Sequence, residues 1–571
     1  MATINLKING RPLQAEDGQT ILDVARANSI DIPTLCFHPQ LERLGGCRLC
    51  LVEIAKVPQL QPACTYPVSE GISVETESPR ATEMRKFVLQ MLFSERNHYC
   101  MFCEMSGDCE LQSQAYRHGL DHWTYPTPYP KYPVDGSRKY FIMDHNRCIL
   151  CRRCIRACND IVGNHTLGLK LRGSNTMVCA DMDVPFGEST CISCGTCLQV
   201  CPTGALVDRK SAYMGRDIQV ERVKSTCTHC SVGCATEIVT RGGQVLRVEG
   251  DWDGHNLGIL CRQGRFDPLY DNRQRLNVPM IRRNGTLSSA SWDEALSAVA
   301  QRVTDAGGHY VKAYATGKVL GETMDEFVNL FHRKIGATVG ILEPFDVANH
   351  LPCDGLLSNL DSADCILVVG ADPLEDHQLV GARIKRARFN GVPLVLVTDT
   401  ENRLASFAQN SFVPPQIKEA VALCQNATSP VVVYGVATSE QEIHVLATLM
   451  GKARFLPLFP ATNGNRAKAL GLGDGLLPVK NRVIYLLVED KDFLEDKVQE
   501  IRDADFLVVH ACYHGALTAV ADVVLPAPLW YEQTGTFSNL EGRQVSVTQA
   551  IPLPENLMPE MEVLAQLGSR M

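Results

Sequence analysis

The chain has 571 residues, which is more than one hydrophobic core usually organises, so several domains are expected. A formal net charge of -9 does not favour nucleic acid as a partner, because binding to a phosphate backbone requires a basic surface. No apolar run reaches the roughly 18 residues that a membrane helix needs, and the first residues carry no export signal. A cytoplasmic protein without a membrane span is therefore expected.

Cysteine is the most informative residue type in this sequence. The chain has 24 cysteines, and most of them lie in groups separated by two or three residues within the first 261 positions. In a secreted protein such groups would indicate disulfides, but without an export signal they indicate metal ligation by reduced thiolates. Thiolates select soft metals, so iron and zinc are the candidates.

The first segment is predicted to be a small β-rich domain. Apolar residues alternate over 4–8, Asn9-Gly10 predicts a hairpin turn, and Thr20 predicts the start of a helix. Four cysteines follow with spacings that suit a [2Fe-2S] cluster, in which the close pair is expected to hold one iron; a four-thiolate zinc site is the alternative. The predicted ligands are Cys36, Cys47, Cys50 and Cys64.

A second ligand set follows a helix predicted over 83–93. Three cysteines there lack a fourth partner, and imidazole is the only good donor nearby, so a [4Fe-4S] site with one histidine ligand is expected. A solvent-facing histidine, with another donor in its place, is the alternative. The predicted ligands are His98, Cys100, Cys103 and Cys109.

An internal repeat occupies 139–209. Each copy has three cysteines two residues apart and a fourth three residues later, and in such repeats the fourth cysteine binds the cluster of the other copy. Two zinc ribbons are the alternative, but they would need separated ligand pairs. One [4Fe-4S] cluster is predicted on Cys148, Cys151, Cys154 and Cys201, and a second on Cys191, Cys194, Cys197 and Cys158.

The last set of cysteines suits another [4Fe-4S] cluster, with zinc again the alternative. It consists of Cys227, Cys230, Cys234 and Cys261. Twenty ligands would then hold one [2Fe-2S] and four [4Fe-4S] clusters.

Beyond residue 275, short apolar runs alternate with helical segments, which predicts parallel strands in an open α/β fold: 365–370, 394–398, 430–434, 483–488 and 506–510. Cys365, Cys424 and Cys512 lie in apolar runs and are expected to be buried hydrophobes.

The order of these ligand sets resembles that of the large iron-sulfur subunit, the G-type subunit, of bacterial complex I (NADH dehydrogenase). It is also similar to relatives of that protein in NAD-linked hydrogenases and formate dehydrogenases. The resemblance implies a multidomain α+β and α/β fold that starts with a β-grasp [2Fe-2S] ferredoxin-type domain. The expected domains are 1–80 for [2Fe-2S], 81–120 for the histidine-ligated [4Fe-4S], 139–209 for the twin [4Fe-4S], 220–275 for the last [4Fe-4S], and 276–571 for a degenerate α/β domain.

The C-terminal part resembles the molybdopterin oxidoreductases in segments such as 291–296, 369–373 and 541–543. Catalytic relatives carry a lysine where this chain has Gln263, and their metal-ligating cysteine lies in an Arg-Cys-His type loop that the surroundings of Cys353 do not match. The C-terminal part is also shorter than a pterin-dinucleotide enzyme of this kind requires. A bound molybdopterin is therefore not expected.

A series of clusters indicates a protein that transfers electrons between two distant reaction sites. The sequence has no convincing nucleotide or flavin motif, so NADH is expected to react on another subunit. The resemblance implies a flavin- and [4Fe-4S]-containing NADH-binding partner with a small [2Fe-2S] companion, and a further redox enzyme that is a hydrogenase, a formate dehydrogenase, or a ferredoxin- or quinone-linked module. The expected role is a non-catalytic electron-transfer subunit, cytoplasmic or held at the periphery of the inner membrane through its partners.

Three other functions remain as alternatives. A catalytic molybdenum or tungsten formate dehydrogenase subunit would need the pterin. An iron-only hydrogenase subunit would need further cysteine motifs after residue 275, where four scattered cysteines remain. A zinc-stabilised interaction scaffold would use the same donors without inorganic sulfide.

Overall fold

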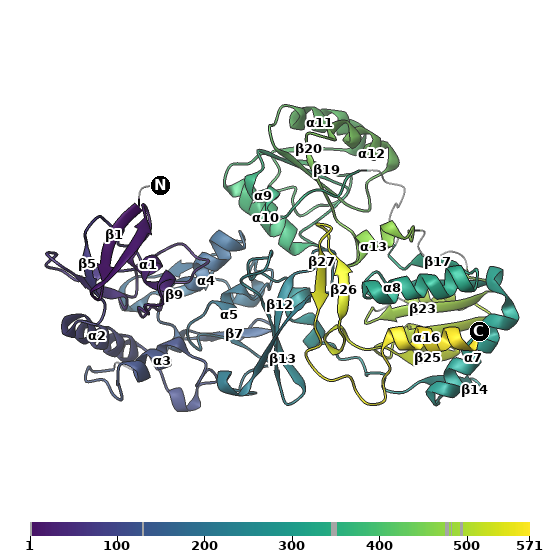
Figure 1. Cartoon of the computed structure of the whole chain (residues 1–571), viewed down its shortest axis with the longest axis horizontal. Coiled ribbons are helices and arrows are strands. Elements are labelled where there is room, and N and C mark those ends of the chain that lie inside the picture. Colours follow the sequence, from purple (N-terminus) through teal and green to yellow (C-terminus); the bar gives the residue numbers. More distant parts are fainter. Residues whose placement is uncertain (1–2, 128–130, 344–350, 474–478, 481, 492–494) are drawn as a thin grey trace. The chain divides into compact units, whose positions relative to one another are not determined.

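The computed structural model describes residues 3–127, 131–343, 351–473, 479–480, 482–491 and 495–571 (Figure 1). Two compact units make up the chain, residues 1–220 and 221–571. The finer division into five domains stays a prediction.

The first unit begins with a five-stranded sheet of order β2-β1-β5-β3-β4. Its strands are β1 (Thr3–Ile8), β2 (Arg11–Glu16), β3 (Leu51–Ile54), β4 (Gln61–Pro62) and β5 (Ser73–Glu75). Asn9 and Gly10 join β1 to β2 with φ of 51° and 73°, the left-handed values of a tight hairpin turn. Helix α1 (Ile21–Ala27) starts at Thr20, whose side chain accepts a hydrogen bond from the Asp23 amide while Asp23 accepts from the Thr20 amide. The predicted order of strand, turn, strand and helix is confirmed.

Short elements build the rest of the first unit. Helix α2 (Pro79–Glu95) contains the predicted helix over 83–93, and it begins at Ser78, which caps the Ala81 amide. Strands β10, β7 and β6 form an antiparallel sheet, and β8 and β9 form a hairpin. The bounds are α3 (Glu110–Arg117), β6 (Val134–Asp135), β7 (Phe141–Asp144), α4 (Arg153–Arg156), β8 (Leu167–Lys170), β9 (Met177–Ala180), α5 (Thr196–Gln199) and β10 (Leu206–Asp208).

The second unit begins with an antiparallel sheet of β11 (Glu221–Thr226), β12 (Ala235–Arg241) and β13 (Gln244–Gly250). The connection between β11 and β12 carries three of the predicted cluster ligands. The fourth immediately precedes helix α6 (Arg262–Arg265).

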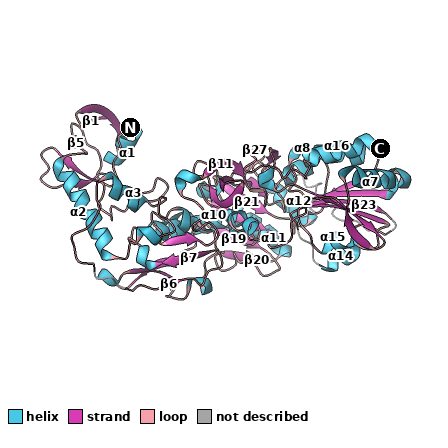
Figure 2. Ribbon diagram, turned by 90° about the horizontal axis from the view of Figure 1, so that it is seen from below, coloured by secondary structure: helices cyan, strands magenta, loops and turns pink. Residues whose placement is uncertain are grey.

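A seven-stranded sheet of order β15-β14-β25-β24-β23-β16-β17 follows, in which the last five strands are parallel. The strands are β14 (Met280–Arg283), β15 (Thr286–Ser289), β16 (Val311–Ala315), β17 (Thr338–Ile341), β23 (Val483–Glu489), β24 (Phe506–Ala511) and β25 (Val523–Pro526). Figure 2 shows α7 (Trp292–Ala306), α8 (Gly321–Val328) and α16 (Glu560–Arg570) on one face, and α14 (Glu495–Ile501) and α15 (Ala516–Val520) on the other. Helices therefore cover both faces, as the open α/β prediction requires.

A second, wholly parallel sheet has the order β20-β19-β18-β21-β22. Its elements are α9 (Asn359–Ser362), β18 (Cys365–Val369), α10 (Gln378–Phe389), β19 (Leu394–Val397), β20 (Asn410–Phe412), α11 (Ile417–Gln425), β21 (Pro430–Tyr434), α12 (Glu440–Leu446) and β22 (Arg454–Pro457). Helix α13 (Gly464–Ala469) and the hairpin of β26 (Gly535–Ser538) and β27 (Gln544–Val547) complete the unit. Cys365, Cys424 and Cys512 are buried, as predicted.

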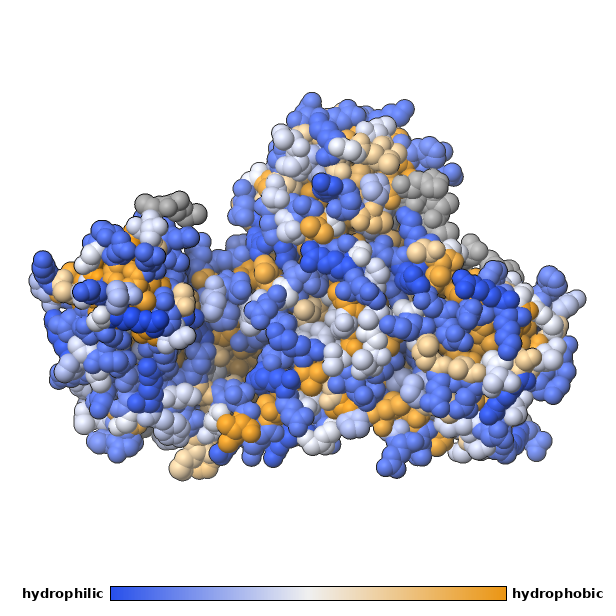
Figure 3. All heavy atoms as spheres, in the orientation of Figure 1, coloured by the Kyte–Doolittle hydropathy of each residue, from blue (hydrophilic) through white to orange (hydrophobic). Residues whose placement is uncertain are grey.

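The surface is largely polar. Figure 3 shows hydrophilic side chains over most of the visible face, with apolar ones in smaller groups. In the described part of the chain, no helix combines the length and apolar character that crossing a membrane requires.

Candidate cluster sites

The four cysteines of the first set come together in two pairs. The sulfur atoms of Cys50 and Cys64 are 3.4 Å apart, and the Cys47 amide points at the Cys36 sulfur at 3.5 Å. A hydrogen bond from the Cys47 thiol lowers the pKa of Cys36 to about 5. The geometry therefore places Cys47 against Cys36 and Cys50 against Cys64, which does not favour the expected sharing of one iron by Cys47 and Cys50; the sharing itself stays a prediction. Arg48 between them has a left-handed φ of 59°, which turns the chain between the two thiols.

The second set lines one small cavity in the first unit. His98 and the three predicted cysteine ligands all face it, together with Gly204 from the segment after the repeat. A Cβ atom on Gly204 would lie only 2.8 Å from the Cys103 sulfur, so the backbone approaches that thiol more closely than any other residue type would allow. Gly204 follows Cys201, the last cysteine of the repeat, by three residues. The sequence alone does not predict its close approach to the Cys103 sulfur.

His98 presents one ring nitrogen to this cavity. Its Nε2 atom is buried and has no hydrogen-bond partner among the described residues, while the ring bonds to the backbone of Leu92. Burial lowers the pKa of His98 to about 4, with the charges of Arg147 and Arg96 adding to the effect, so the ring is neutral. A neutral imidazole held through one nitrogen by a backbone carbonyl is the usual form of a histidine metal ligand. The ring therefore fits the predicted ligand role better than the solvent-facing alternative.

The two copies of the repeat share one backbone conformation. Leu150 and Ser193, at matching positions, have φ of 53° and 56°, and each donates its amide hydrogen to the preceding cysteine sulfur at 3.4 Å. Arg152 and Gly195, two residues later, are also left-handed and precede α4 and α5. Each copy therefore curls its first three cysteines around a common centre, with backbone amides directed at sulfur.

Electrostatic coupling between the repeats follows the crossed pattern. Burial and then the charge of Cys201 raise the pKa of Cys151 to about 12. Burial also raises the pKa of Cys191 to about 12, and the charges of Cys194 and Cys158 act in the same direction. Each fourth cysteine thus acts on thiols of the other copy, and the crossed ligand sets stay a prediction.

In the last set, Cys227 and Cys234 are buried, and Cys230 and Cys261 are partly buried. Burial, followed by the charge of Cys261, raises the pKa of Cys227 to about 12. The Gly264 amide donates to the Cys261 sulfur at 3.3 Å, and a Cβ atom on Gly264 would lie 3.1 Å from the Cys227 sulfur. Gly264 therefore has the same close-approach role here that Gly204 has in the first unit.

Positive side chains surround the ligand sets of the first unit. The guanidinium of Arg156 donates to the backbone carbonyls of Cys36 and Cys151, which belong to two different sets. Arg153 is buried and makes two hydrogen bonds to the Glu110 carboxylate. Clusters with four thiolates are anionic, so the positive charge of Arg156 offsets charge that burial would otherwise disfavour, whereas the charge of Arg153 is neutralised by Glu110. No pattern in the sequence singles out either arginine.

Backbone atoms approach the thiols closely in several of the ligand sets. Amide hydrogens of Leu150, Ser193 and Gly264 are directed at cysteine sulfur atoms. A Cβ atom on Gly204 or Gly264 would lie within 3.1 Å of a cysteine sulfur. Amide hydrogens on thiolates and glycines beside them suit clusters that contain inorganic sulfide, so the donor sets fit iron-sulfur clusters.

The cavity at the second parallel sheet has a lining that does not suit a phosphorylated pterin. The carboxyl edge of the five-stranded sheet contains a cavity of about 580 Å³, where α/β folds commonly bind nucleotides. Its carboxylates are Asp372, Glu375, Asp376, Asp399, Glu401 and Glu442. Arg403 is the one basic residue among its described lining residues, and it is already paired with Glu375. Such a lining repels phosphate. Cys353 is half-buried against the core of the seven-stranded sheet, and the neighbouring 349–350 lie outside the described residues.

Five family profiles match successive parts of the chain. In the first unit they are the 2Fe-2S iron-sulfur cluster binding domain at residues 1–79, the NADH-ubiquinone oxidoreductase-G iron-sulfur binding region at 85–123, and the ferredoxin-like domain of NADH-quinone oxidoreductase subunit 3 at 140–207. In the second unit they are the molybdopterin oxidoreductase Fe4S4 domain at 220–269, and molybdopterin oxidoreductase at 275–427 and 416–570.

Individual proteins show the same similarity. The second G-type subunit of the NADH-quinone oxidoreductase of Rhizobium meliloti is 32% identical over 71% of this chain and 49% of its own length, so the chain spans about half of that relative. The mitochondrial 78 kDa subunit of the NADH-ubiquinone oxidoreductase of Candida albicans is 27% identical over 98% of this chain and 81% of its own. A solved chain of a NAD+-reducing [NiFe]-hydrogenase is 34% identical over 38% of this chain and 91% of its own, with a TM-score of 0.36 that supports no structural argument.

Proposed function

The chain belongs to the molybdopterin oxidoreductase family, and we propose that it works without a pterin, as the electron-transfer iron-sulfur subunit of an NADH-linked oxidoreductase complex. One [2Fe-2S] and four [4Fe-4S] clusters would each accept and release one electron at a time. The proposed ligands are Cys36, Cys47, Cys50, Cys64, His98, Cys100, Cys103, Cys109, Cys148, Cys151, Cys154, Cys158, Cys191, Cys194, Cys197, Cys201, Cys227, Cys230, Cys234 and Cys261.

Three ligand sets share a single apolar core in the first unit, and this observation carries the proposal. The core consists of Leu35, Leu49, Leu89, Phe93, Leu111, Ala115 and Ile149. Packed against it are Cys47 of the first set, Cys100 and Cys109 of the second, and Cys151 of the repeat. A common core fixes the distances between the sets, because packed side chains move little. Rigid, short separations are what a chain of electron carriers requires.

Hydrogen bonds also join neighbouring sets. Arg156 bonds to the carbonyls of both Cys36 and Cys151, and the Glu110 amide donates to the Pro202 carbonyl at 2.9 Å, directly after Cys201. Cys109 and Cys201 therefore lie on neighbouring segments. The residues of this chain position and insulate the clusters, and oxidation of NADH is assigned to a flavin- and [4Fe-4S]-containing partner with a small [2Fe-2S] companion.

A catalytic molybdenum or tungsten enzyme is the second candidate, since the family membership itself favours it. Gln263 stands where catalytic relatives carry a lysine, and the acidic cavity at the second sheet disfavours phosphate. The non-catalytic role therefore fits this chain better.

Apolar side chains are exposed beside the second ligand set. Met101 is 85% exposed, Phe102 70% and Tyr213 73%, and the Tyr213 hydroxyl donates to the Phe102 carbonyl at 3.1 Å. Exposed apolar residues that gather in one place mark protein interfaces. A redox partner that docks here would bring its own centre close to the His98 site.

We expect the double variant Phe102→Ser, Tyr213→Ser to bind its partner about tenfold more weakly, a loss of about 1.4 kcal/mol. The measurement is retention of the flavin-containing subunits when the tagged complex is purified under anaerobic conditions at a series of dilutions. Leu171→Ser with Met182→Ser, which changes two similarly exposed apolar residues elsewhere in the first unit, is the matched control.

Iron content must stay equal in both double variants, so that a loss of binding is not a loss of clusters. Equal retention of the partner by wild type and the Phe102, Tyr213 variant would exclude this surface as the docking site. Absence of any flavin-containing partner from the wild-type preparation would contradict the proposed function itself.

A further inference from the structure

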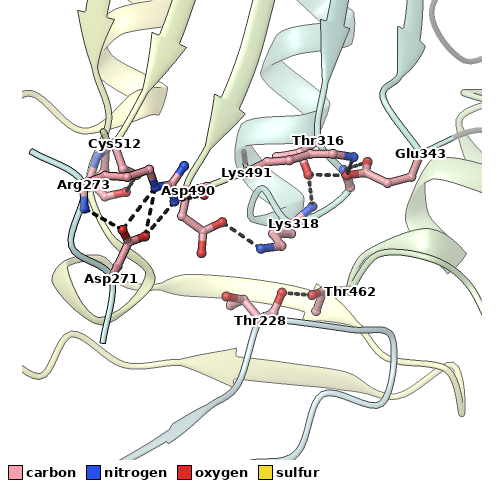
Figure 4. Close-up of polar contacts among 12 residues, drawn as sticks. Thr228, Asp271, Arg273, Thr316, Lys318, Glu343, Thr462, Asp490, Lys491 and Cys512 are labelled. Carbon is pink, nitrogen blue, oxygen red and sulfur yellow. Dashed lines mark hydrogen bonds and ion pairs between the residues drawn. The ribbon is translucent and has the colours of Figure 1, made fainter. Parts of the chain in front are cut away.

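The carboxyl edge of the seven-stranded sheet is filled by charged side chains of the protein itself (Figure 4). Thr316 and Lys318 follow β16, Glu343 follows β17, and Asp490 and Lys491 follow β23. Parallel strands end at one edge, so the topology brings these residues together from segments far apart in the sequence. An edge of this kind is where open α/β sheets usually bind a ligand.

Two lysine–carboxylate ion pairs lie at this edge. The Lys318 Nζ atom lies 2.7 Å from the Asp490 carboxylate, and the Lys491 Nζ atom lies 2.6 Å from the Glu343 carboxylate. The side chain of Lys318 is 15% exposed. Nearby, the Arg273 guanidinium is 2.7 Å from the Asp271 carboxylate and also donates to the Asp490 carbonyl at 2.6 Å. Removing one member of a pair would leave a charge without its partner in a poorly hydrated place.

The first of these pairs lies beside the loop that carries the last ligand set. The Asn463 amide donates to the Gly317 carbonyl at 2.8 Å, and the neighbouring Thr462 hydroxyl donates to the carbonyl of Thr228, the residue after Cys227. Figure 4 shows the Lys318 ammonium between Asp490 and the segment with Thr228.

The two charges act on the same thiol with opposite signs. Burial is the largest cause of the raised pKa of Cys227, Lys318 lowers that pKa, and Asp490 raises it. The Lys491–Glu343 pair acts less strongly on Cys227 than Lys318 or Asp490 does. The edge therefore has one ion pair coupled strongly to the ligand set and a second, similar pair that is coupled more weakly.

We propose that the Lys318–Asp490 ion pair sets the reduction potential of the cluster held by Cys227, Cys230, Cys234 and Cys261, with Lys318 raising that potential and Asp490 lowering it. This inference rests on the proposed function, which assigns a cluster to these ligands. One electron from an external reductant adds one negative charge at the site, and no proton is required. Lys318 stabilises that charge and Asp490 opposes it; water screens the mostly buried Lys318 less than Asp490, whose side chain is 33% exposed.

The test is an anaerobic redox titration with dithionite, followed by electron paramagnetic resonance. The signal of this cluster is assigned as the one that disappears in Cys230→Ala. We expect Lys318→Met to shift its midpoint potential downward and Asp490→Asn to shift it upward. The double variant is expected to return close to the wild-type value, because both charges are then absent.

Lys491→Met is the matched control, since it removes a lysine charge from the second ion pair of the same edge. Its midpoint potential is expected to shift much less than that of Lys318→Met, because this pair acts less strongly on the ligand set. Lys318→Arg, which keeps the charge, is expected to stay at the wild-type value, and it remains informative if Lys318→Met loses the cluster altogether.

Shifts of the same sign in Lys318→Met and Asp490→Asn, or no shift in either, would overturn the proposal while leaving the cluster assignment intact. An equal shift in Lys491→Met would also overturn it, because the effect would then be a general one of surface charge. If Cys230→Ala removes no signal from the wild-type spectrum, the cluster assignment itself is contradicted, and with it the basis of this inference.

Discussion

Replacing Cys148 and Cys201 together by alanine is expected to remove one cluster, about four iron atoms per chain, because both thiols belong to the same crossed set. Replacing Cys148 and Cys158 together is expected to remove two clusters, about eight iron atoms, because each of these thiols then serves a different centre. Iron and acid-labile sulfide measured per chain, after anaerobic purification, give the two numbers directly.

The pair of variants separates crossed from local ligation. If each run of four cysteines held its own cluster, the two double variants would exchange their results. Cys179→Ala is the matched control, since Cys179 lies in β9 of the same unit but belongs to no predicted set. Its iron content is expected to equal that of the wild type.

Replacing His98 by alanine is expected to lower the iron content from about eighteen to about fourteen atoms per chain. The reason is geometric: His98 lines the same cavity as the three thiols, and its buried Nε2 atom has no hydrogen-bond partner among the described residues. His98→Cys supplies a thiolate at the same place, so its iron content is expected to return towards the wild-type value.

His122→Ala is the control for the loss of an imidazole from the same region, because the His122 side chain is 75% exposed. It is expected to change neither the iron content nor the resonance spectrum. Iron content in His98→Ala equal to the wild type, with an unchanged spectrum, would show that another donor completes the site.

The sequence predicts those features of this protein that depend on local spacing. The hairpin at Asn9-Gly10, the capped helix after Thr20 and the buried strands of the C-terminal half all follow from short patterns, and the structure contains each of them. The conformation of the loop that carries the first three cysteines of each copy is similarly local, because the same left-handed φ recurs at Leu150 and Ser193.

Features that depend on long-range packing were not accessible in the same way. The pairing of Cys36 with Cys47 and of Cys50 with Cys64 depends on how Arg48 turns the loop, and the spacing suggested a different pair. The ion pair between Lys318 and Asp490 joins residues 172 positions apart, which only the sheet order brings together. The sequence does not indicate that Gly204 and Gly264 lie against cysteine sulfur atoms, and only the folded structure shows these contacts.

Metal and sulfide analysis of the anaerobically purified chain tests the central claim most directly. We predict about eighteen iron atoms per chain with a matching amount of acid-labile sulfide, in visible-absorbing and, after dithionite, paramagnetic protein, and no stoichiometric molybdenum, tungsten or zinc. A colourless protein that contains zinc without sulfide, or one with molybdenum or tungsten equal to the chain concentration, would contradict the account.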